Sequence, residues 1–303
     1  MSQIPSLPIN PRHVALQFAR RAPLDAAQFL YGEITQRMLQ RLAYIRIEPQ
    51  VVLDAGCGAG HAVEPLHARY PAARYVGIDH CQPLLDTAIA RHAGKGSLWN
   101  RLRNKPTPET RFQLADMAQT GLAPQSIDMV WSNMALHWHP QPHAVLAEWR
   151  RILKSQGLVM FSCLGPASMQ ELRQALDTAR LQTATPQFVD MHDFGDLLVE
   201  NGFADPVMDQ ETITLTYKSA DKLLEDLKVL GGNPQSNRRA GLPGRVWQGR
   251  LLDALEKQRH LDGTLHLTLE VAYGHAWRAE AWQSAEGETR ISVDAIRRPK
   301  KPD

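Results

Sequence analysis

Val51-Val52-Leu53-Asp54-Ala55-Gly56-Cys57-Gly58-Ala59-Gly60 is the stretch of sequence that decides the fold. A short apolar run ends in an acid, and three glycines follow at alternate positions. This pattern is typical of a buried parallel strand that turns sharply into a helix and leaves room for a ligand beside its backbone. A second apolar run, Tyr75–Ile78, leads into Asp79, which lies 19 residues after Gly60. An acid about 20 residues beyond a glycine turn is placed to bind a ribose diol, so we predict a nucleoside-binding α/β domain.

The glycine pattern also indicates the kind of nucleoside. Dinucleotide folds usually show G-x-G-x-x-G, where the start of the helix binds a pyrophosphate. Here the pattern is D-x-G-x-G-x-G, and its leading acid would repel a phosphate but suits an ammonium group. From about Val51 to Leu164 the chain resembles the class I methyltransferases that depend on S-adenosylmethionine (SAM), whose cofactor carries such a group at its amino-acid end.

This resemblance implies a set of cofactor-binding residues. Asp54 and the Gly56–Gly58 backbone would hold the methionine end of SAM, and Asp79 would bind the ribose. An acid just after the third strand would meet the adenine amino group, and an asparagine after the fourth would contact the cofactor. The predicted cofactor set is Asp54, Gly56, Cys57, Gly58, Asp79, His80, Asp116, Met117 and Asn133. The alternatives are structural: a plain strand–helix turn, an acid that precedes a helix, and a helix-capping Asp at position 116.

Composition narrows the class of protein. The chain has 303 residues, a net charge of +2 and 22% charged residues, which gives no general attraction to nucleic acid or membrane. No apolar stretch approaches the roughly 20 residues that span a bilayer, and the start lacks the features of a secretory signal. The three cysteines show no metal-ligand or disulfide spacing. We therefore expect a cytoplasmic protein with reduced thiols, no metal site, and no nucleic-acid or membrane partner.

Strand and helix patterns alternate along the chain. This alternation predicts an α/β, Rossmann-like fold with a seven-stranded, mostly parallel sheet, an antiparallel last strand and a helical cap. Strands are expected at Val51–Ala55, Arg74–Asp79, Phe112–Ala115, Ile127–Ser132, Leu158–Cys163, Thr212–Tyr217 and Leu265–Tyr273. Helices are expected at Ala26–Tyr44, His61–Arg69, Leu84–His92, Pro140–Leu153, Ser168–Thr183, Asp190–Asn201, Ser219–Leu230 and Gly244–Gln258. We divide the chain into an N-terminal helical cap (1–45), a SAM-binding core (46–165), a substrate-covering C-terminal part (166–277) and a flexible tail (278–303).

Longer motifs narrow the resemblance. The segments are Ser132–Trp138, Leu146–Lys154, Phe161–Gly165, Met169–Arg173 and Leu224–Asn233. They are similar to the malonyl-acyl-carrier-protein O-methyltransferases of biotin synthesis. A related family, the mitochondrial complex I assembly factor that hydroxylates an arginine, is similar to this chain at Phe29–Leu42, His137-Trp138 and Glu225-Asp226-Leu227. The first resemblance implies methylation of the free carboxyl of malonyl-acyl carrier protein, or of malonyl-CoA. Modification of another protein, and a non-enzymatic scaffold, remain alternatives.

Candidate substrate residues follow from that resemblance. A carboxylate is already a nucleophile at neutral pH, so no general base is required, and the sequence shows no catalytic triad. An arginine is expected to orient the carboxylate: Arg173 first, then Arg20 and Arg21. His137 is expected on the substrate side. The family has a tyrosine soon after its Phe-Arg-Ala run, and here Tyr31, further along, is the candidate.

Two basic segments are candidates for docking an acidic carrier protein. They are Lys95–Lys105 and the run from Asn237 to Arg245. Alternatively, both are ordinary surface loops.

Overall fold

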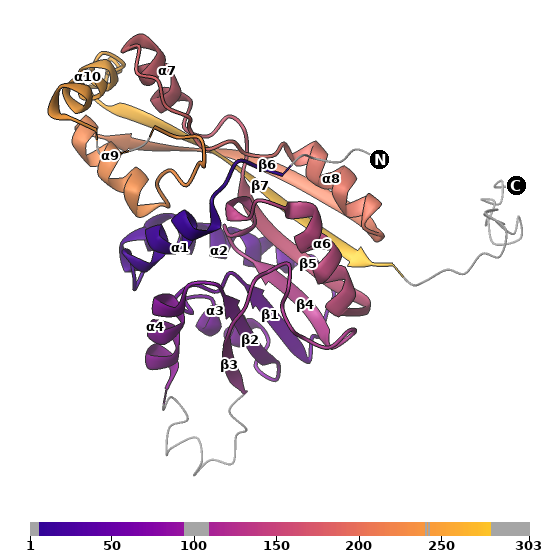
Figure 1. The fold of residues 1–303 in the computed structure, drawn as a ribbon. Helices are drawn as coiled ribbons and strands as arrows, with labels where there is room; N and C mark the ends of the chain where they lie inside the picture. Colours follow the sequence, from indigo (N-terminus) through magenta and orange to yellow (C-terminus); the bar gives the residue numbers. More distant parts are fainter. Residues whose placement is uncertain (1–5, 94–108, 240, 242, 280–303) are drawn as a thin grey trace, which may run out of the picture.

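One seven-stranded sheet organises the molecule. The structure is a computed structural model that describes residues 6–93, 109–239, 241 and 243–279. The strands lie in the order β3-β2-β1-β4-β5-β7-β6 (Figure 1). Their bounds are β1 Val51–Ala55, β2 Arg74–Asp79, β3 Thr110–Leu114, β4 Ile127–Ser132, β5 Leu153–Leu164, β6 Phe203–Tyr217 and β7 Leu265–Arg278.

The direction of the strands confirms the predicted fold class. The neighbouring pairs from β3 to β5 are all parallel. The last strand, β7, inserts between β5 and β6 and is antiparallel to both. All five residues of β1 are buried, as expected for a parallel strand covered on both faces. The carboxyl ends of β1, β2, β3 and β4 therefore meet at one edge of the sheet, where ligands bind in such folds.

Helices cover both faces of the sheet. The helix bounds are α1 Pro11–Ala19, α2 Gln28–Leu42, α3 Val63–Arg69, α4 Gln82–His92, α6 Pro142–Ile152, α7 Gln170–Thr178, α8 Met191–Glu200, α9 Ala220–Val229 and α10 Arg245–Glu256, with short 3₁₀ turns at Asp25–Ala27 and Leu136–Trp138. One buried cluster joins α2 and α3 to the sheet, and a second joins α6 and α8 to it. Helices α7, α9 and α10 gather around one end of β6 and β7 (Figure 1).

Helix α2 shows how sequence periodicity becomes packing. Leu30, Ile34, Met38 and Leu42 recur every four residues, and each is at most 2% exposed. Residues four apart lie on one face of a helix, so this spacing directs a continuous apolar stripe onto the sheet.

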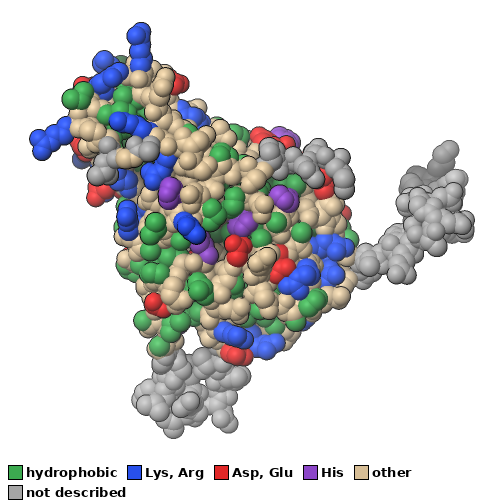
Figure 2. All heavy atoms as spheres, in the orientation of Figure 1, with side chains coloured by type: hydrophobic (Ala, Val, Ile, Leu, Met, Phe, Trp, Pro, Cys, Tyr) green, Lys and Arg blue, Asp and Glu red, His purple; other side chains and the backbone are tan. Residues whose placement is uncertain are grey.

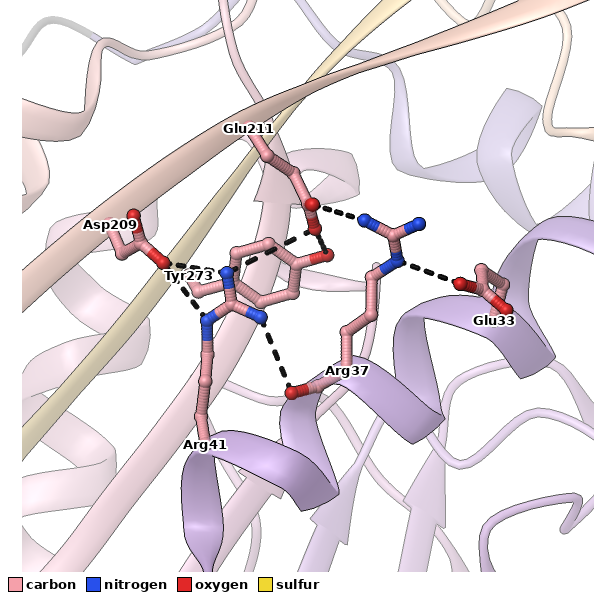
Figure 3. Close-up of polar contacts among 6 residues, drawn as sticks. All are labelled: Glu33, Arg37, Arg41, Asp209, Glu211 and Tyr273. Atoms are coloured by element: carbon pink, nitrogen blue, oxygen red, sulfur yellow. Dashed lines mark hydrogen bonds and ion pairs between the residues drawn. The ribbon is translucent and has the colours of Figure 1, made fainter. Parts of the chain in front are cut away.

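Polar contacts fasten the outer side of α2 to β6 and β7 (Figure 3). Arg37 pairs with Glu33 on its own helix and with Glu211 on β6. Arg41 binds Asp209, with Nη2 2.6 Å from Oδ2, and its guanidinium carbon lies 3.8 Å from the centre of the Tyr273 ring. The Tyr273 hydroxyl donates to Glu211. Charged and aromatic contacts thus add to the apolar face of α2.

Several elements differ from the expectation: β5 begins at Leu153 instead of Leu158, β7 continues to Arg278 instead of Tyr273, and α7 ends at Thr178 instead of Thr183. Two further differences have a clear physical reason. Strand β6 begins at Phe203 instead of Thr212 and contains Pro206, beside an irregularity in its pairing with β7. Proline is tolerated there because β6 is the edge of the sheet. Helix α1 was not expected as a separate element. The Asn10 side chain caps it by accepting from the amide nitrogens of Arg12 and His13.

The basic segment Lys95–Lys105 and the tail beyond 279 lie outside the described residues. No helix in the described part of the chain combines the length and the hydropathy needed to cross a membrane.

Candidate functional site

The glycine turn after β1 adopts the conformation that its sequence predicts. Gly56, Gly58 and Gly60 have φ of +81°, +53° and +74°. A Cβ added to Gly56 would lie 2.3 Å from the Cβ of Ala135, so no larger residue fits there. The amide nitrogens of Gly56 and Cys57 both donate to the Ile78 carbonyl, at 2.8 and 2.9 Å. These two amides therefore already have an acceptor. The contribution of the turn to ligand binding is the room left by glycines that carry no side chain.

Asp54 lies at the end of β1 beneath this turn. Its side chain is buried, with 2% of the residue exposed, and it accepts a hydrogen bond from the Tyr75 hydroxyl. Burial raises the pKa of Asp54 to about 7, against the opposing effect of the Tyr75 hydrogen bond. A buried carboxylate without a cation is costly, so this position favours a positively charged ligand group.

Asp79 ends β2 and joins the turn to the start of α4. Its Oδ2 accepts from the amide of Gly58 at 2.9 Å, and its Oδ1 accepts from the amide of Cys81 at 2.8 Å. Burial raises its pKa, and the neighbouring His80 opposes that rise. Each carboxylate oxygen can accept a second hydrogen bond. The two oxygens can therefore receive a pair of adjacent hydroxyl groups.

Asp116 lies beyond β3 and is held from two sides. Its Oδ1 accepts from the Ala118 amide at 2.7 Å and lies 3.1 Å from Nε2 of His139. The hydrogen bond with His139 lowers the pKa of Asp116. The bond to Ala118 is a cap-like contact, but it closes a turn because no helix follows in residues 117–119. The structure thus leaves Asp116 ionised at the rim of the site.

Asn133 joins β4 to the cap. Its Nδ2 donates to the Tyr31 carbonyl at 2.9 Å and to Oγ1 of Thr35 at 2.8 Å, and its Oδ1 accepts from Ser162 at 2.9 Å. Its amide group therefore fastens α2 to β4 and β5 in addition to facing the site.

These residues surround one hollow of about 1000 Å³, its open mouth included. All nine predicted cofactor residues line it: Asp54, Gly56, Cys57, Gly58, Asp79, His80, Asp116, Met117 and Asn133. Its cover comes from residues that the sequence analysis did not assign to the site, chiefly Val14 and Phe18 of α1 and Leu24. The Asn10-Pro11 pair, a cap followed by a proline at the first helical position, was the signal for α1.

The predicted substrate residues are dispersed. Tyr31 lines the hollow, and its hydroxyl donates to the Leu230 carbonyl at 2.9 Å. His137 is buried, and burial lowers its pKa to about 3, so its ring is neutral at ordinary pH. Arg20 is exposed, and it does not line the hollow. Arg173 lies elsewhere, and its guanidinium donates to the carbonyls of Ser168 at 2.6 Å and Pro166 at 2.8 Å.

Trp138, by contrast, lines the hollow directly. A Cβ added to Gly231 would lie 2.2 Å from the indole ring, and Gly231 has φ +134°. The turn after α9 therefore closes over Trp138 at van der Waals contact, which ties a distant part of the sequence to the site.

Possible metal ligands do not form a cluster within residues 6–93, 109–239, 241 and 243–279. No group of three or more His, Cys, Asp or Glu side chains there could hold an ion. The three cysteines, Cys57, Cys81 and Cys163, are buried free thiols.

Comparison with known proteins gives consistent results. A family model described as a methyltransferase domain matches residues 53–161. The chain is 42% identical to the malonyl-[acyl-carrier protein] O-methyltransferase of Gallionella capsiferriformans, over 94% of this chain and 97% of that protein. It is 44% identical to the enzyme of the same name from Laribacter hongkongensis, over 86% of each chain.

Solved structures agree on the fold. The YcgJ protein of Bacillus subtilis superposes with a TM-score of 0.54 at 14% identity, covering 82% of this chain and all of that one. A putative methyltransferase of Bacillus halodurans also gives 0.54, at 17% identity, over 81% of this chain and 99% of that one.

Proposed function

The chain belongs to the malonyl-[acyl-carrier protein] O-methyltransferase family, and from this membership we propose that it methylates the free carboxylate of a malonyl thioester carried by acyl carrier protein. The methyl donor in the proposal is SAM, in keeping with the methyltransferase domain at residues 53–161. The names of the relatives favour a carrier protein over coenzyme A as the bearer of the malonyl group.

One observation supports the cofactor assignment above all: three acids at or just beyond the carboxyl ends of β1, β2 and β3 converge on one hollow beside a glycine turn. In this proposal Asp54 faces the ammonium group of SAM, Asp79 binds the ribose hydroxyls and Asp116 meets the adenine amino group. The residues fit the molecule, because no cation among the described residues pairs with the buried Asp54, and Asp79 has free acceptor capacity.

SAM, when bound, supplies a methyl group on a positively charged sulfur, which a carboxylate oxygen can take by direct displacement. A malonyl carboxyl has an ordinary pKa near 4 and is ionised at neutral pH, so the protein need not remove a proton. Burial lowers the pKa of His137 to about 3, so its ring would be only a weak base, which is consistent with a reaction that needs none. The task of the chain is then to align the substrate and to exclude water, and Val14, Phe18 and Trp138 provide an apolar cover for that purpose.

We further infer that the reaction serves an early step of biotin synthesis, in which a methyl ester masks the charge of the growing acyl chain. The cytoplasm stays the predicted compartment, and nucleic acid and membrane stay outside the predicted partners.

The experiment uses the purified chain with labelled SAM and malonyl-acyl carrier protein, and it follows the mass of the intact carrier. We expect a gain of one methyl group on malonyl carrier and none on acetyl carrier, which lacks the free carboxylate. A carrier that stays unmodified while the protein binds SAM would contradict the proposal and direct attention to protein arginine substrates.

A matched pair of variants tests the site. Asp79→Asn should lose SAM binding, since it removes a charge and an acceptor inside the hollow. Asp86→Asn removes the same charge from the exposed face of α4, where the carboxylate only accepts from Gln82, and should bind SAM normally. Equal affinities in the two variants would contradict the placement of the ribose.

A further inference from the structure

Arg21, just beyond α1, has a guanidinium nitrogen with no hydrogen-bond partner among the described residues. Its Nη2 donates to Oε1 of Gln17 at 2.7 Å. Its Nη1 is buried and has no hydrogen-bond acceptor, and no Asp or Glu in the described part of the chain pairs with the side chain. Burial lowers the pKa of Arg21, which reflects the cost of holding this cation away from water. A buried donor on a cation is expensive to leave unpaired, so the position calls for an anion.

Arg21 is not itself a lining residue of either hollow, but its neighbours line two of them. On one side its guanidinium carbon lies 5.9 Å from the centre of the Phe18 ring, and Phe18 lines the cofactor hollow. On the other side its neighbours are Gln17 and Gly232, which line a separate groove. A Cβ added to Gly232 would lie 3.0 Å from Nη2 of Arg21.

The groove lies among α7, α9, α10 and the segment after α9, and its lining is largely apolar. It includes Leu172 and Leu176 of α7, Leu224 of α9, and Trp247 and Leu251 of α10. We call this surface the acyl groove.

Basic side chains border the acyl groove. Lys228, Arg238 and Arg239 line it, and none of the three forms an ion pair with a described residue. Lys and Arg side chains are also numerous over α7, α9 and α10 in the space-filling view (Figure 2). The groove therefore offers a ligand both positive charge and apolar surface.

A short turn separates the acyl groove from the cofactor hollow. The Leu230 carbonyl accepts from the Tyr31 hydroxyl, and Gly231 packs on the Trp138 ring. Tyr31 and Trp138 face the cofactor hollow, whereas Gly232, the next residue of the turn, faces the groove. At this turn, therefore, one layer of residues separates the groove from the cofactor hollow.

Resting on the function proposed above, we propose that the acyl-pantetheine arm of the substrate lies in the acyl groove and that Arg21 binds the free malonyl carboxylate at its inner end. The chemistry of the arm matches that of the groove: a phosphate for the basic side chains, a slender chain for the apolar lining, and an anion for the unpaired guanidinium. In the reaction, a carboxylate oxygen forms a bond to the methyl carbon as the sulfur–methyl bond breaks. Its electron pair stays on sulfur, and no proton moves.

A contact between Arg21 and the malonyl carboxylate would also explain why the methylated product leaves. Methylation removes the negative charge of the carboxylate, so the ester no longer forms a charge-assisted contact with Arg21. Arg173 cannot take this role in the observed conformation, because two backbone carbonyls already hold its guanidinium.

The test compares Arg21→Met with Arg20→Met, which removes an exposed charge from the adjacent residue. The probes are amide analogues of malonyl-pantetheine and acetyl-pantetheine, titrated into protein saturated with S-adenosylhomocysteine. We expect the wild type and Arg20→Met to prefer the malonyl probe by about tenfold to a hundredfold, as for a charge-assisted hydrogen bond. Arg21→Met should lose this preference, and Arg21→Lys should keep part of it. An Arg21→Met protein that keeps the full preference would overturn the assignment.

Unchanged affinity for S-adenosylhomocysteine shows that a variant is folded. If Arg21→Met does not bind S-adenosylhomocysteine normally, Arg21→Lys provides the test instead. Lysine keeps the positive charge but cannot form the two-pronged contact of a guanidinium with a carboxylate. An Arg21→Lys protein with the full wild-type preference for the malonyl probe would therefore also overturn the assignment. The groove is tested by Leu224→Trp, which should raise the KM for malonyl carrier about tenfold, against Leu261→Trp at a fully exposed site. Equal KM values would refute the path of the arm.

Failure of the proposed function gives a different result. A wild type that prefers the malonyl probe but transfers no methyl group would refute the activity and leave the anion site standing. Methyl transfer at the wild-type rate by Arg21→Met would refute the role of Arg21 and leave the activity standing.

Discussion

Binding of S-adenosylhomocysteine should weaken as the pH falls, because Asp54 must be ionised to hold the ammonium group. Burial has raised the pKa of this carboxyl to about 7, so in the free protein it takes up a proton below neutrality. A nearby cation favours the charged form, and the complex therefore requires Asp54 to lose that proton. Affinity should rise with pH up to about 7 and then level off.

The size of the effect follows from the pKa. If only the ionised form binds, the apparent Kd is multiplied by one plus the ratio of protonated to ionised Asp54. That factor is about 1.1 at pH 8 and about 100 at pH 5, so binding should weaken about 90-fold over this range. Stability changes in the opposite direction. A carboxyl with a raised folded pKa stabilises the free protein at low pH, and this contribution is lost between its unfolded value near 4 and about 7. Tighter binding at high pH therefore cannot come from a more stable free protein.

Isothermal titration calorimetry across this pH range makes the measurement, with Asp54→Asn as the control. Asp79 also has a raised pKa and adds a dependence of the same sign, whereas the pKa of Asp116 is lowered. Asp54→Asn should therefore bind more weakly at pH 8 and show a shallower dependence on pH than the wild type. A wild-type affinity that stays constant within about twofold would refute the placement of Asp54 against the ammonium group.

Three further changes test the packing at the site and elsewhere in the fold. Gly231→Ala should lower methyl transfer about tenfold or more, because its Cβ would lie 2.2 Å from the Trp138 ring; activity equal to the wild type would show that the turn moves freely. Gly249→Ala, where an added Cβ meets nothing within 4 Å, should instead raise the free energy of unfolding by about 0.5–1 kcal/mol in urea titrations; a loss of stability would contradict the open space beside α10. Tyr273→Phe removes the hydroxyl that donates to Glu211 and should cost about 1 kcal/mol by the same titrations, and an unchanged midpoint would show that this contact adds nothing.

Much of the core could be predicted from the sequence because its signals are local. The bounds of β1, β2 and β4 agree with the predicted bounds, since each is a short buried run that ends in a turn signal. The beginning of β6 was not predictable in the same way. Pro206 argues against a strand unless the strand is known to lie at a sheet edge, and that position depends on β7, which comes some 50 residues later.

The cofactor side and the substrate side of the site also differ in how far the sequence predicts them. The cofactor side follows from residues that end consecutive strands, so a linear pattern locates Asp54, Asp79 and Asp116 together. The proposed substrate side depends on contacts between the end of α1 and the turn after α9, which are distant in the sequence. Nothing local distinguishes Arg21 from Arg173, and only the structure shows that carbonyls hold one guanidinium while a nitrogen of the other lacks an acceptor among the described residues.

The most direct test of the proposed function is to locate the transferred methyl group chemically. The protein is incubated with SAM that carries a labelled methyl group and with malonyl-acyl carrier protein, and the isolated carrier is then treated with mild alkali. A methyl ester predicts that the label leaves as methanol, in proportion to the carrier that was modified. Label that stays bound to the carrier after this treatment, or that is absent from it, would contradict carboxyl methylation.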